Sequence, residues 1–594
     1  MAGMLATYKS KPLGSTFGNA NIEYRPSYSA DWGDYISFAE RLREKADREG
    51  VDLLLIDTGD RVEGNGLYDA SDPKGKFTTD IFKEQDIDVI CSGNHELYKK
   101  RTSDHEYLET VPNFEGNYLA SNIDIYNPET GELVPLAQRY KKFTTKNLGI
   151  RIIAFGFLFN FNNNANNTVV QPVSQAIQEK WFQEAIRDRE VDLFLVTGHV
   201  PLRSPEFDLV YKAIRSQQWD VSIQLFGGHT HIRDYAKYDS NAHALESGRY
   251  METIGFMSIT GLRSGGKATH DSRKHKPDVL ATKAAPSFSR RYIDNNLFSF
   301  HHHTGLNATT FPTQHGRNIS SAIASARKAL DLDKRFGCAP KDLWTNRAPF
   351  PSDNSIFTWL QDSVLPDIIK DALHSNSSKL VLMNTGSLRF DIFEGPFTVD
   401  TTYTVSPFTS GFRQIKNVPF SIAKQLLRIL NQEVPQLTPI SHALRAKEPV
   451  SKDEIEFGPS GTETALVGHL SNDLQIPLTA EAMEASPLTP GYTTTDDAGS
   501  DGDDTLHSRI KFHRVPNIVE SRTGFPASTG SMKWSTSIEP QTVDLVYGDF
   551  IEDYVLLALR FLGTDYSLSD AETCANGQTL TALIAEWVQD NWKC

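Results

Sequence analysis

The feature that most constrains this chain is a series of short apolar runs, each followed almost at once by glycine and a polar residue. Segments between these runs, such as residues 35–48 and 173–189, have helical spacing. Alternating buried strands and helices predict an α/β domain with a buried sheet. The runs lie at residues 51–57, 87–91, 191–196 and 221–226, and they lead into Gly59-Asp60, Gly93-Asn94-His95, Gly198-His199 and Gly228-His229-Thr230-His231.

The polar residues that follow these runs are of the types that bind divalent metal ions. In α/β sheets, sites gather at the carboxyl ends of strands, so we expect Asp60, Asn94, His199, His229 and His231 to converge. A two-metal phosphoesterase needs a carboxylate that bridges both ions, together with imidazole and amide ligands. His229 and His231 are two positions apart, so in a strand their side chains would point the same way.

These blocks, in this order, resemble the signature blocks of calcineurin-like metallophosphoesterases. Further blocks narrow the resemblance to the 5′-nucleotidase branch, namely residues 118–122, 246–250, 384–389 (Asn-Thr-Gly-Ser-Leu-Arg) and 406–408 (Ser-Pro-Phe). The resemblance covers most of the chain. It implies an N-terminal metallophosphoesterase β-sandwich flanked by helices, and a C-terminal α/β domain that binds the substrate.

The resemblance also implies roles for individual residues. Asp60 would bridge two divalent metal ions, for which Zn, Mn, Co and Fe are candidates. His95 would lie beside the phosphate and stabilise charge in the transition state. The implied reaction is hydrolysis of a nucleotide phosphomonoester by in-line attack of a metal-activated water on phosphorus. The remaining implied metal ligands are Asn94, His199 and His229 at one site and His231 at the other.

In the second half, the resemblance implies contacts to a small-molecule nucleotide or related phosphate ester. Asn384 and Arg389 would bind the nucleotide, and Phe408 would stack on the base. Tyr554 is our candidate for a second stacking aromatic, with a packed helix residue as the equal alternative. Arg347 is a possible substitute for a further family arginine, whose position here is occupied by Ser352.

The sequence departs from the family at its beginning. The family starts with a strand that ends in Asp-x-His, which fills the second metal site with Asp60 and His231. Here the first aspartate is Asp31 and the first histidine is His95. We also find no strand-like apolar run in residues 1–25, so we expect the first strand to be missing and the second metal site to be incomplete.

Two interpretations of this departure remain open. The chain is either an N-terminally incomplete form of a secreted enzyme, which we favour, or a protein that has lost one metal site. The second interpretation allows a non-catalytic relative with a decayed site. A phosphodiesterase or UDP-sugar hydrolase of the same family also remains possible. A local departure is Tyr98, where the family has an aspartate that orients the catalytic histidine; Glu96 or Asp104 could replace it.

We predict three parts along the chain. Residues 1–305 form the metallophosphoesterase domain, residues 306–337 a linker with a helix, and residues 338–594 the substrate domain. Residues 485–508 are rich in Thr, Asp, Gly and Ser, and we predict that they form a mobile insertion in that domain. The oligomeric state is not predictable from the sequence.

The composition of the chain limits which binding partners and which cellular compartment we expect for it. The formal net charge of −15 argues against a broad nucleic-acid surface. No stretch approaches the about 20 apolar residues that span a bilayer, and the sequence has no signal peptide. Four glycosylation motifs, Asn-x-Ser/Thr, begin at Asn166, Asn307, Asn318 and Asn376 and favour a secreted or vacuolar glycoprotein. Of the four cysteines, we expect Cys574 and Cys594 to pair and Cys91 to be a free core residue.

Overall fold

The computed structural model describes residues 2–7, 30–231, 233–248, 250–262, 286–373, 377–432, 513–525 and 539–594. It divides into two compact units. The first unit holds the described residues of Met1–Val62 and Ser71–Ala329. The second holds those of Glu63–Ala70, Leu330–Ala485 and Lys511–Cys594. The predicted insertion at 485–508 lies outside the described residues.

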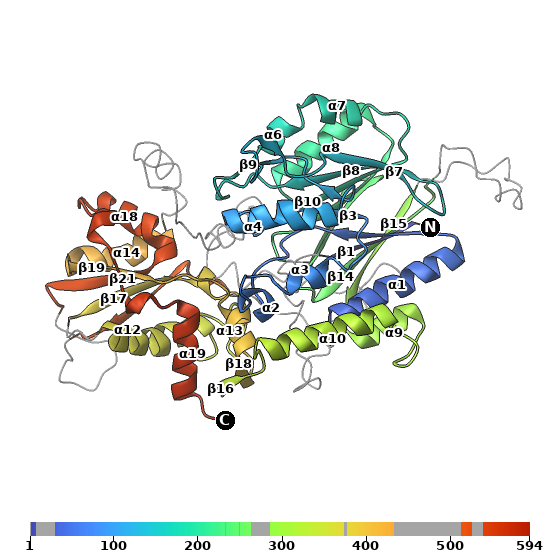
Figure 1. The fold of residues 1–594 in the computed structure, drawn as a ribbon. Coiled ribbons are helices and arrows are strands. Elements are labelled where there is room, and N and C mark those ends of the chain that lie inside the picture. The colour runs from blue at the N-terminus through green and yellow to red at the C-terminus, as the bar shows by residue number, and fades with distance from the viewer. Residues whose placement is uncertain are drawn as a thin grey trace, which may run out of the picture. The chain divides into compact units, whose positions relative to one another are not determined.

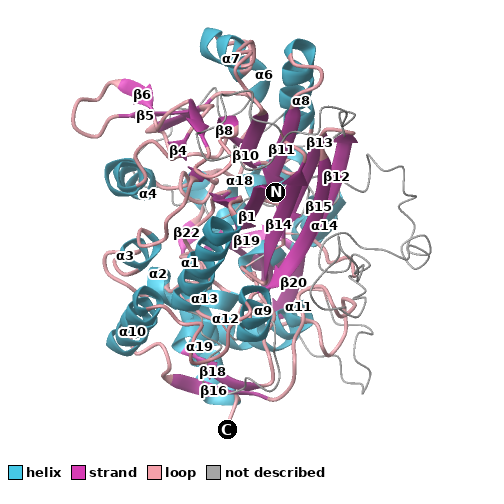
Figure 2. Ribbon diagram, turned by 90° about the vertical axis from the view of Figure 1, so that its right-hand side faces the viewer, coloured by secondary structure: helices cyan, strands magenta, loops and turns pink. Residues whose placement is uncertain are grey.

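The first unit is a sandwich of two six-stranded sheets. Each sheet has a run of four parallel strands, with antiparallel strands on one side of this run in one sheet and on both sides in the other, so the predicted α/β β-sandwich is confirmed. One sheet has the order β15 (Ser287–Asp294), β14 (Thr253–Thr260), β1 (Ala2–Thr7), β2 (Asp52–Asp57), β3 (Val89–Cys91) and β4 (Tyr118–Leu119). The other, seen in Figure 2, has the order β12 (Arg233–Asp239), β13 (Ala242–Ser247), β11 (Ser222–Gly227), β10 (Leu193–His199), β8 (Arg151–Leu158) and β7 (Tyr140–Thr144).

Apolar side chains fill the space between these sheets. Leu54, Ile56 and Val89 of one sheet belong to the same buried cluster as Leu193 and Leu195 of the other. Fully burying a side chain of this kind contributes about 1.5–3 kcal/mol relative to leaving it exposed. This core holds the two sheets against each other. The residues that follow β2, β3, β10 and β11 lie at the ends of these strands.

Helices cover both outer faces of the sandwich (Figure 1). The sheet with β8 and β10 is covered by α6 (Val173–Ala176), α7 (Lys180–Ala185) and α8 (Pro205–Gln217), whose apolar side chains share one buried cluster with it. The other sheet carries α1 (Trp32–Glu49), α9 (Leu297–Thr304) and α10 (Gln314–Ala329). Asp31 caps α1 by accepting the Asp34 N–H at 2.9 Å, and Phe38 of α1 stacks on Phe300 of α9 at 4.3 Å.

The prediction that the first strand is missing is wrong. Residues Ala2–Thr7 form β1, which pairs in parallel with β2, from Ala2 opposite Asp52 to Thr7 opposite Asp57, and antiparallel with β14. The segment was overlooked because its residues, Ala-Gly-Met-Leu-Ala-Thr, are mostly small and do not form an apolar run. The strand leads into Tyr8-Lys9-Ser10, so the aspartate and histidine of an Asp-x-His block are still absent there.

Smaller elements surround the strand ends of the first unit. A three-stranded sheet consists of β6 (Leu133–Pro135), β5 (Ile123–Tyr126) and β9 (Thr168–Val170). Between β2 and β4 lie α3 (Thr78–Phe82), α4 (Lys100–His105), a π-helical turn (Glu106–Thr110) and α5 (Val111–Asn113). The helix predicted within the linker is α10, and the boundary between the units falls directly after it, at Ala329.

The second unit has a five-stranded sheet with helices on both faces. Its order is β20 (Ile518–Thr523), β17 (Lys379–Asn384), β21 (Thr542–Gly548), β19 (Phe412–Pro419) and β22 (Glu572–Thr573). One face packs against α11 (Ile356–Trp359), α12 (Leu365–Leu373) and α19 (Leu580–Asn591), and the other against α14 (Phe420–Gln432) and α18 (Glu552–Phe561). A two-stranded sheet pairs β16 (Arg335–Ala339) with β18 (Gly395–Thr398).

Two features of the second unit differ from expectation. The disulfide joins Cys338 to Cys594, while Cys574 is free and buried. The predicted Cys574–Cys594 pair is therefore wrong, because proximity in sequence was a poor guide to a bond between residues 256 positions apart. The unit also takes up Glu63–Ala70, including the short helix α2 (Gly66–Asp69), whose Gly66 N–H donates to Asp400 of α13 (Val399–Val405) at 2.9 Å.

Candidate active site

The ends of β2, β3, β10 and β11 bring several predicted residues together. Asp60 Oδ2 lies 3.1 Å from His199 Nε2 and 3.9 Å from His95 Nε2. The His199 and His229 rings are 5.2 Å apart, in an edge-on arrangement. Asp60, Asn94 and His199 are completely buried. Side chains from four separate strand ends thus form one cluster.

Two glycines allow the loop after β2 to pack directly against the loop after β3. Gly59 has a φ of +89°, and a Cβ added there would lie 2.3 Å from the Gly93 nitrogen. A Cβ on Gly93 would lie 2.3 Å from Asp60 Oδ1. Neither position has room for a side chain, so the Gly-Asp and Gly-Asn pairs of the sequence reflect packing between the two loops.

Glu96 holds the two loops together. Its carboxylate accepts backbone N–H groups from Asp60 at 2.9 Å, Arg61 at 2.5 Å and Gly93 at 2.7 Å. Asp60 itself has a φ of +63°, which is unfavourable for a residue with a Cβ. The hydrogen bonds of Glu96 stabilise this backbone and so fix the direction of the Asp60 carboxylate.

The hydrogen bonds of His199 determine which of its nitrogens faces Asp60. Nδ1 lies 2.9 Å from the Thr58 carbonyl oxygen, which only accepts, so Nδ1 carries a proton. In the neutral imidazole, Nε2 then presents a lone pair to Asp60 Oδ2 at 3.1 Å. Two lone pairs at this distance repel unless a proton or a metal ion lies between them. The pair is therefore arranged to share either a proton or a metal ion.

Tyr98, where the family has an aspartate, contacts both Asn94 and His95. Asn94 Nδ2 donates to the Tyr98 hydroxyl at 2.9 Å, and the Tyr98 ring stands edge-on to His95 at 5.1 Å. Asn94 Oδ1 is buried and receives no hydrogen bond from any described residue, as expected of a ligand oxygen. The two carboxylates considered as replacements are engaged elsewhere, Glu96 with backbone N–H groups and Asp104 with Lys100 and Asn167.

His229 and His231 lie in a turn between β11 and β12, not in a strand as we predicted. Their φ angles are +80° and +61°. His229 stacks on Phe159 at 4.2 Å, and His231 stands edge-on to Tyr250 at 5.3 Å. His229 is thus placed with Asp60 and His199, whereas the contact shown for His231 is with Tyr250.

Glu246 of β13 holds the middle residue of this turn. Its carboxylate accepts the Thr230 backbone N–H at 3.1 Å and also the Thr230 hydroxyl. Burial raises the pKa of Glu246 well above its ordinary value. The two hydrogen bonds to Thr230 hold the turn in place between His229 and His231.

Arg61 is a component of the site that the sequence analysis missed. Its buried guanidinium donates to Asp57 at 2.9 Å, to the Cys91 carbonyl at 2.8 Å and to the Tyr118 hydroxyl at 3.0 Å, and it pairs with Glu106. Burial raises the pKa of Asp57 to about 6, although Arg61 acts to lower it. The only sequence signal was an arginine placed directly after Gly-Asp, because Glu106 and Tyr118 are remote in sequence.

In the second unit, two of the predicted nucleotide residues, Arg389 and Phe408, contact each other. Asn384 ends β17, and the Arg389 guanidinium lies 5.8 Å from the centre of the Phe408 ring. Tyr554 instead lies in the first turn of α18 and packs against the core cluster, which is the alternative the sequence left open. Phe550 follows Gly548-Asp549 at the end of β21, where Asp549 accepts the Gly411 N–H at 2.9 Å, and it packs against the same cluster.

Arg347 also remains a candidate contact in this unit. It lies over the Trp344 ring at 4.9 Å and 3.9 Å from Asp391. Asp391 accepts two hydrogen bonds from Thr345, each 2.7 Å long. The contacts with Trp344 and Asp391 therefore hold the Arg347 guanidinium in one position within the second unit.

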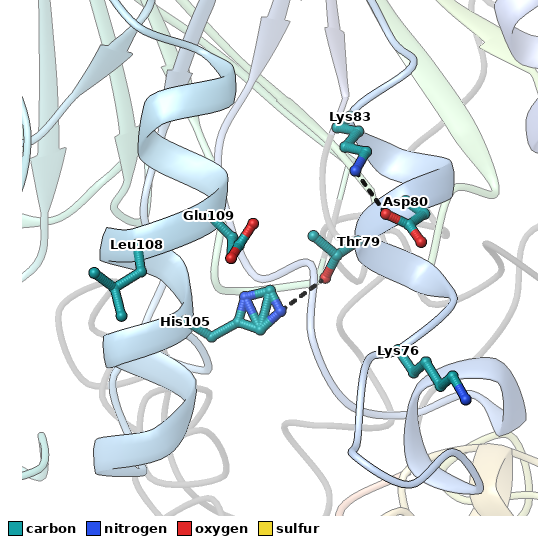
Figure 3. Close-up of a pocket in the computed structure, with 7 residues that line it drawn as sticks. All are labelled: Lys76, Thr79, Asp80, Lys83, His105, Leu108 and Glu109. Carbon is teal, nitrogen blue, oxygen red and sulfur yellow. Dashed lines mark hydrogen bonds and ion pairs between the residues drawn. The ribbon is translucent and has the colours of Figure 1, made fainter.

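A cleft elsewhere on the first unit is not part of this cluster. It has a volume of about 370 Å³ and lies between α3 and the α4 region (Figure 3). His105 Nε2 lies 3.5 Å from the Thr79 hydroxyl, and Lys83 pairs with Asp80 at 2.6 Å. Two of the charged residues that line the cleft, Lys83 and Asp80, thus pair with each other. None of the lining residues is a predicted site residue.

Within the described ranges, no three His, Cys, Asp or Glu side chains converge to hold a metal ion by themselves. The side chains at these strand ends are nevertheless of the types that bind divalent ions. They offer a carboxylate, imidazole nitrogens and an unengaged amide oxygen, the mixture that suits such ions. No helix in the described part of the chain is long and apolar enough to cross a membrane.

Comparison with known proteins agrees with this geometry. A family model for calcineurin-like phosphoesterases matches residues 29–233, and one for the C-terminal domain of NAD nucleotidase matches residues 342–556. A protein of Arthroderma benhamiae named as a secreted protein is 37% identical over 596 residues, which covers 96% of this chain and 87% of that protein.

Solved structures show the same similarity over the whole chain. The crystal structure of 5′-nucleotidase from Candida albicans has a TM-score of 0.77 and 34% sequence identity, and the match covers 99% of this chain and 98% of that one. A 5′-nucleotidase precursor from Thermus thermophilus has a TM-score of 0.55 at 12% identity, with 100% and 97% covered, which shows the fold alone.

Fold and site together define a two-domain phosphoester hydrolase. The chain belongs to the calcineurin-like phosphoesterase family, in its 5′-nucleotidase branch.

Proposed function

We propose that this chain hydrolyses nucleotide phosphomonoesters in a metal-dependent reaction. Asp60, Asn94, His199 and His229 would hold one divalent ion, and Asp60 with His231 would supply part of a second site. Bound divalent ions in such a site polarise a phosphoryl oxygen and lower the pKa of a bound water. Zn, Mn, Co and Fe are the candidates.

The chain's own residues support this chemistry in distinct ways. Asp60 is fixed by the Glu96 hydrogen bonds, and its Oδ1 accepts the His95 backbone N–H at 2.9 Å. The His95 imidazole would donate to a phosphate oxygen and stabilise charge in the transition state. In the second unit, Asn384 and Arg389 would contact the nucleotide, and Phe408 would stack on its base.

The observation that carries the proposal is the arrangement of Asp60 and His199. Asp60 Oδ2 and His199 Nε2 lie 3.1 Å apart, with the second imidazole nitrogen bonded to Thr58, which places a carboxylate oxygen and an imidazole nitrogen where both could bind one metal ion. The buried amide oxygen of Asn94 and the ring of His229 at the same strand ends extend this into a ligand set.

Metal content and phosphate release test the proposal directly. We would measure bound metal, and hydrolysis of AMP and p-nitrophenyl phosphate, for the full chain with each candidate metal and after chelation. His199→Ala should reduce bound metal and abolish turnover. His105→Ala, a histidine of the separate cleft in the same unit, is the matched control and should change neither.

The same assay separates the competing function. The competing function is a non-catalytic relative with a decayed second metal site, which would neither bind metal nor release phosphate. A chain that binds no metal and releases no phosphate would establish that alternative and overturn the proposal. Faster hydrolysis of a UDP-sugar or a phosphodiester than of AMP would place the chain elsewhere in the family.

We further propose that the protein is a glycoprotein of a secretory compartment, either secreted or vacuolar. The Cys338–Cys594 disulfide supports this, because disulfides persist mainly in oxidising compartments. The relative from Arthroderma benhamiae carries the name of a secreted protein. Fractionation of fungal cells that express the native gene would test the route, and a cytosolic, reduced protein would contradict it.

A further inference from the structure

Three of the four glycosylation motifs lie within the described residues, and their surroundings differ. Asn166, Asn307 and Asn318 are all exposed, so exposure of the asparagine does not separate them. The motif also requires a hydroxyl residue two positions later. The exposure and the hydrogen bonding of that hydroxyl residue distinguish one motif from the other two.

The motif at Asn307 is exposed along its whole length. It follows α9, and residues 307–310 are all exposed. Asn307 Oδ1 accepts the Thr309 backbone N–H at 3.0 Å and the Thr309 hydroxyl at 2.7 Å. The hydroxyl therefore lies beside the side-chain amide that would be modified, in a turn that an enzyme can reach without disturbing other elements.

The hydroxyl residues of the other two motifs are used by the fold. Thr168 begins β9, is buried, and donates its hydroxyl to the Ala165 carbonyl at 2.9 Å. Asn318 lies inside α10, and the Ser320 hydroxyl donates to Asp31 Oδ1 at 2.8 Å, on the residue that caps α1. Presenting either motif requires local opening of a strand or a helix.

We propose that Asn307 carries an N-linked glycan, and that Asn166 and Asn318 are poorly modified. The inference rests on the proposed secretory route. Asn307 Nδ2 would form a bond to the anomeric carbon of a lipid-linked oligosaccharide. The bond from that carbon to the lipid pyrophosphate would break, the pyrophosphate leaving with the electron pair and the amide losing one proton.

The test uses the full chain, directed into the yeast secretory pathway by an added signal sequence and purified from the medium. Peptides are treated with peptide N-glycosidase in heavy-oxygen water, which marks each formerly glycosylated asparagine, and occupancy is read by mass spectrometry. We expect occupancy at Asn307 to be several-fold higher than at Asn166 or Asn318. Asn376 lies outside the described residues, and its peptide is scored separately.

A matched pair of variants completes the design. Thr309→Ala removes the motif and should abolish the glycan at Asn307, whereas Thr309→Ser retains the hydroxyl and should keep it. An unmodified Asn307 in the secreted protein would overturn the proposal, and so would equal occupancy at Asn166 or Asn318. Because the signal sequence is supplied, this failure is distinct from failure of the native secretory route, which fractionation tests.

Discussion

The strand ends of the first unit and the surroundings of Phe408 in the second unit are built by different means. Around Asp60, charged and polar groups are completely buried and each is held by several others, as Arg61 is held by Asp57, Glu106 and the Cys91 carbonyl. Around Phe408, the Arg389 guanidinium lies over the ring and the Thr581 hydroxyl donates to the backbone carbonyl, and elsewhere in this unit a disulfide joins Cys338 to Cys594. Groups that perform chemistry need a fixed position, whereas groups that recognise a substrate need a matching surface.

The largest expected effect is at the centre of the first cluster. Asp60→Asn keeps the shape of the side chain but removes the charge that faces His199. We expect turnover to fall by about 10³-fold, the scale seen when a group that stabilises the transition state is removed. The melting temperature should change little. Turnover close to that of the wild type would show that the cluster is not the reaction centre.

Removing Arg61 should break the network that supports the first cluster. Arg61→Met keeps much of the volume but leaves Asp57 and Glu106 buried without their partner, which costs about 3–5 kcal/mol. Urea unfolding measures this cost in the free energy of unfolding. The double variant with Glu106→Gln should recover part of it, because one unpaired charge is gone. A single variant as stable as the wild type would contradict our account of the network.

The disulfide is the counterpart of this network in the second unit. Cys338→Ser should lower stability by about 2–5 kcal/mol, the usual cost of losing a native disulfide. Cys574→Ala removes a free cysteine of the same unit and serves as the control, with a smaller loss expected. Both are read from thermal unfolding under non-reducing conditions. Equal losses would mean that the disulfide does not stabilise the unit beyond ordinary packing.

At Phe408 in the second unit, a smaller and different change is expected. Phe408→Ala should raise KM for AMP by about 10-fold with little change in kcat, since stacking of a base on an aromatic ring contributes about 1–3 kcal/mol. Tyr554→Phe, within α18, should leave both constants unchanged. A fall in kcat alone for Phe408→Ala would place this residue nearer to the chemistry than we propose.

The smallest effect concerns an ion pair outside both regions. Burial acts to raise the pKa of Asp239, but hydrogen bonds from Arg215, Asn241 and Tyr211 outweigh it and bring this pKa down to about 2. A lowered pKa contributes stability above the unfolded-state value of about 3.9, and this is lost as pH falls toward 2. The stability difference between wild type and Asp239→Asn should therefore shrink across that interval. A constant difference would show that the pairing is not electrostatic.

These regions also differ in how far the sequence predicts them. The position of Asp60, His199 and His229 follows from strand ends in a parallel sheet, a regular arrangement that periodicity reveals. The partners of Arg61 could not be predicted, because Glu106 lies in a π-helical turn and Tyr118 on another strand. The left-handed turn at His229 was missed for a similar reason, since the Glu246 side chain that holds it comes from a separate strand.

The segment Glu63–Ala70 has a consequence for how this protein can be divided. It stands in the sequence of the first half, yet it packs with the second unit, where Gly66 donates to Asp400. A fragment cut after Ala329 would therefore leave the second unit without α2, and the buried Asp400 carboxylate without that donor. The two halves of the sequence therefore do not correspond to the two units, because residues 1–329 include a helix that belongs to the second unit.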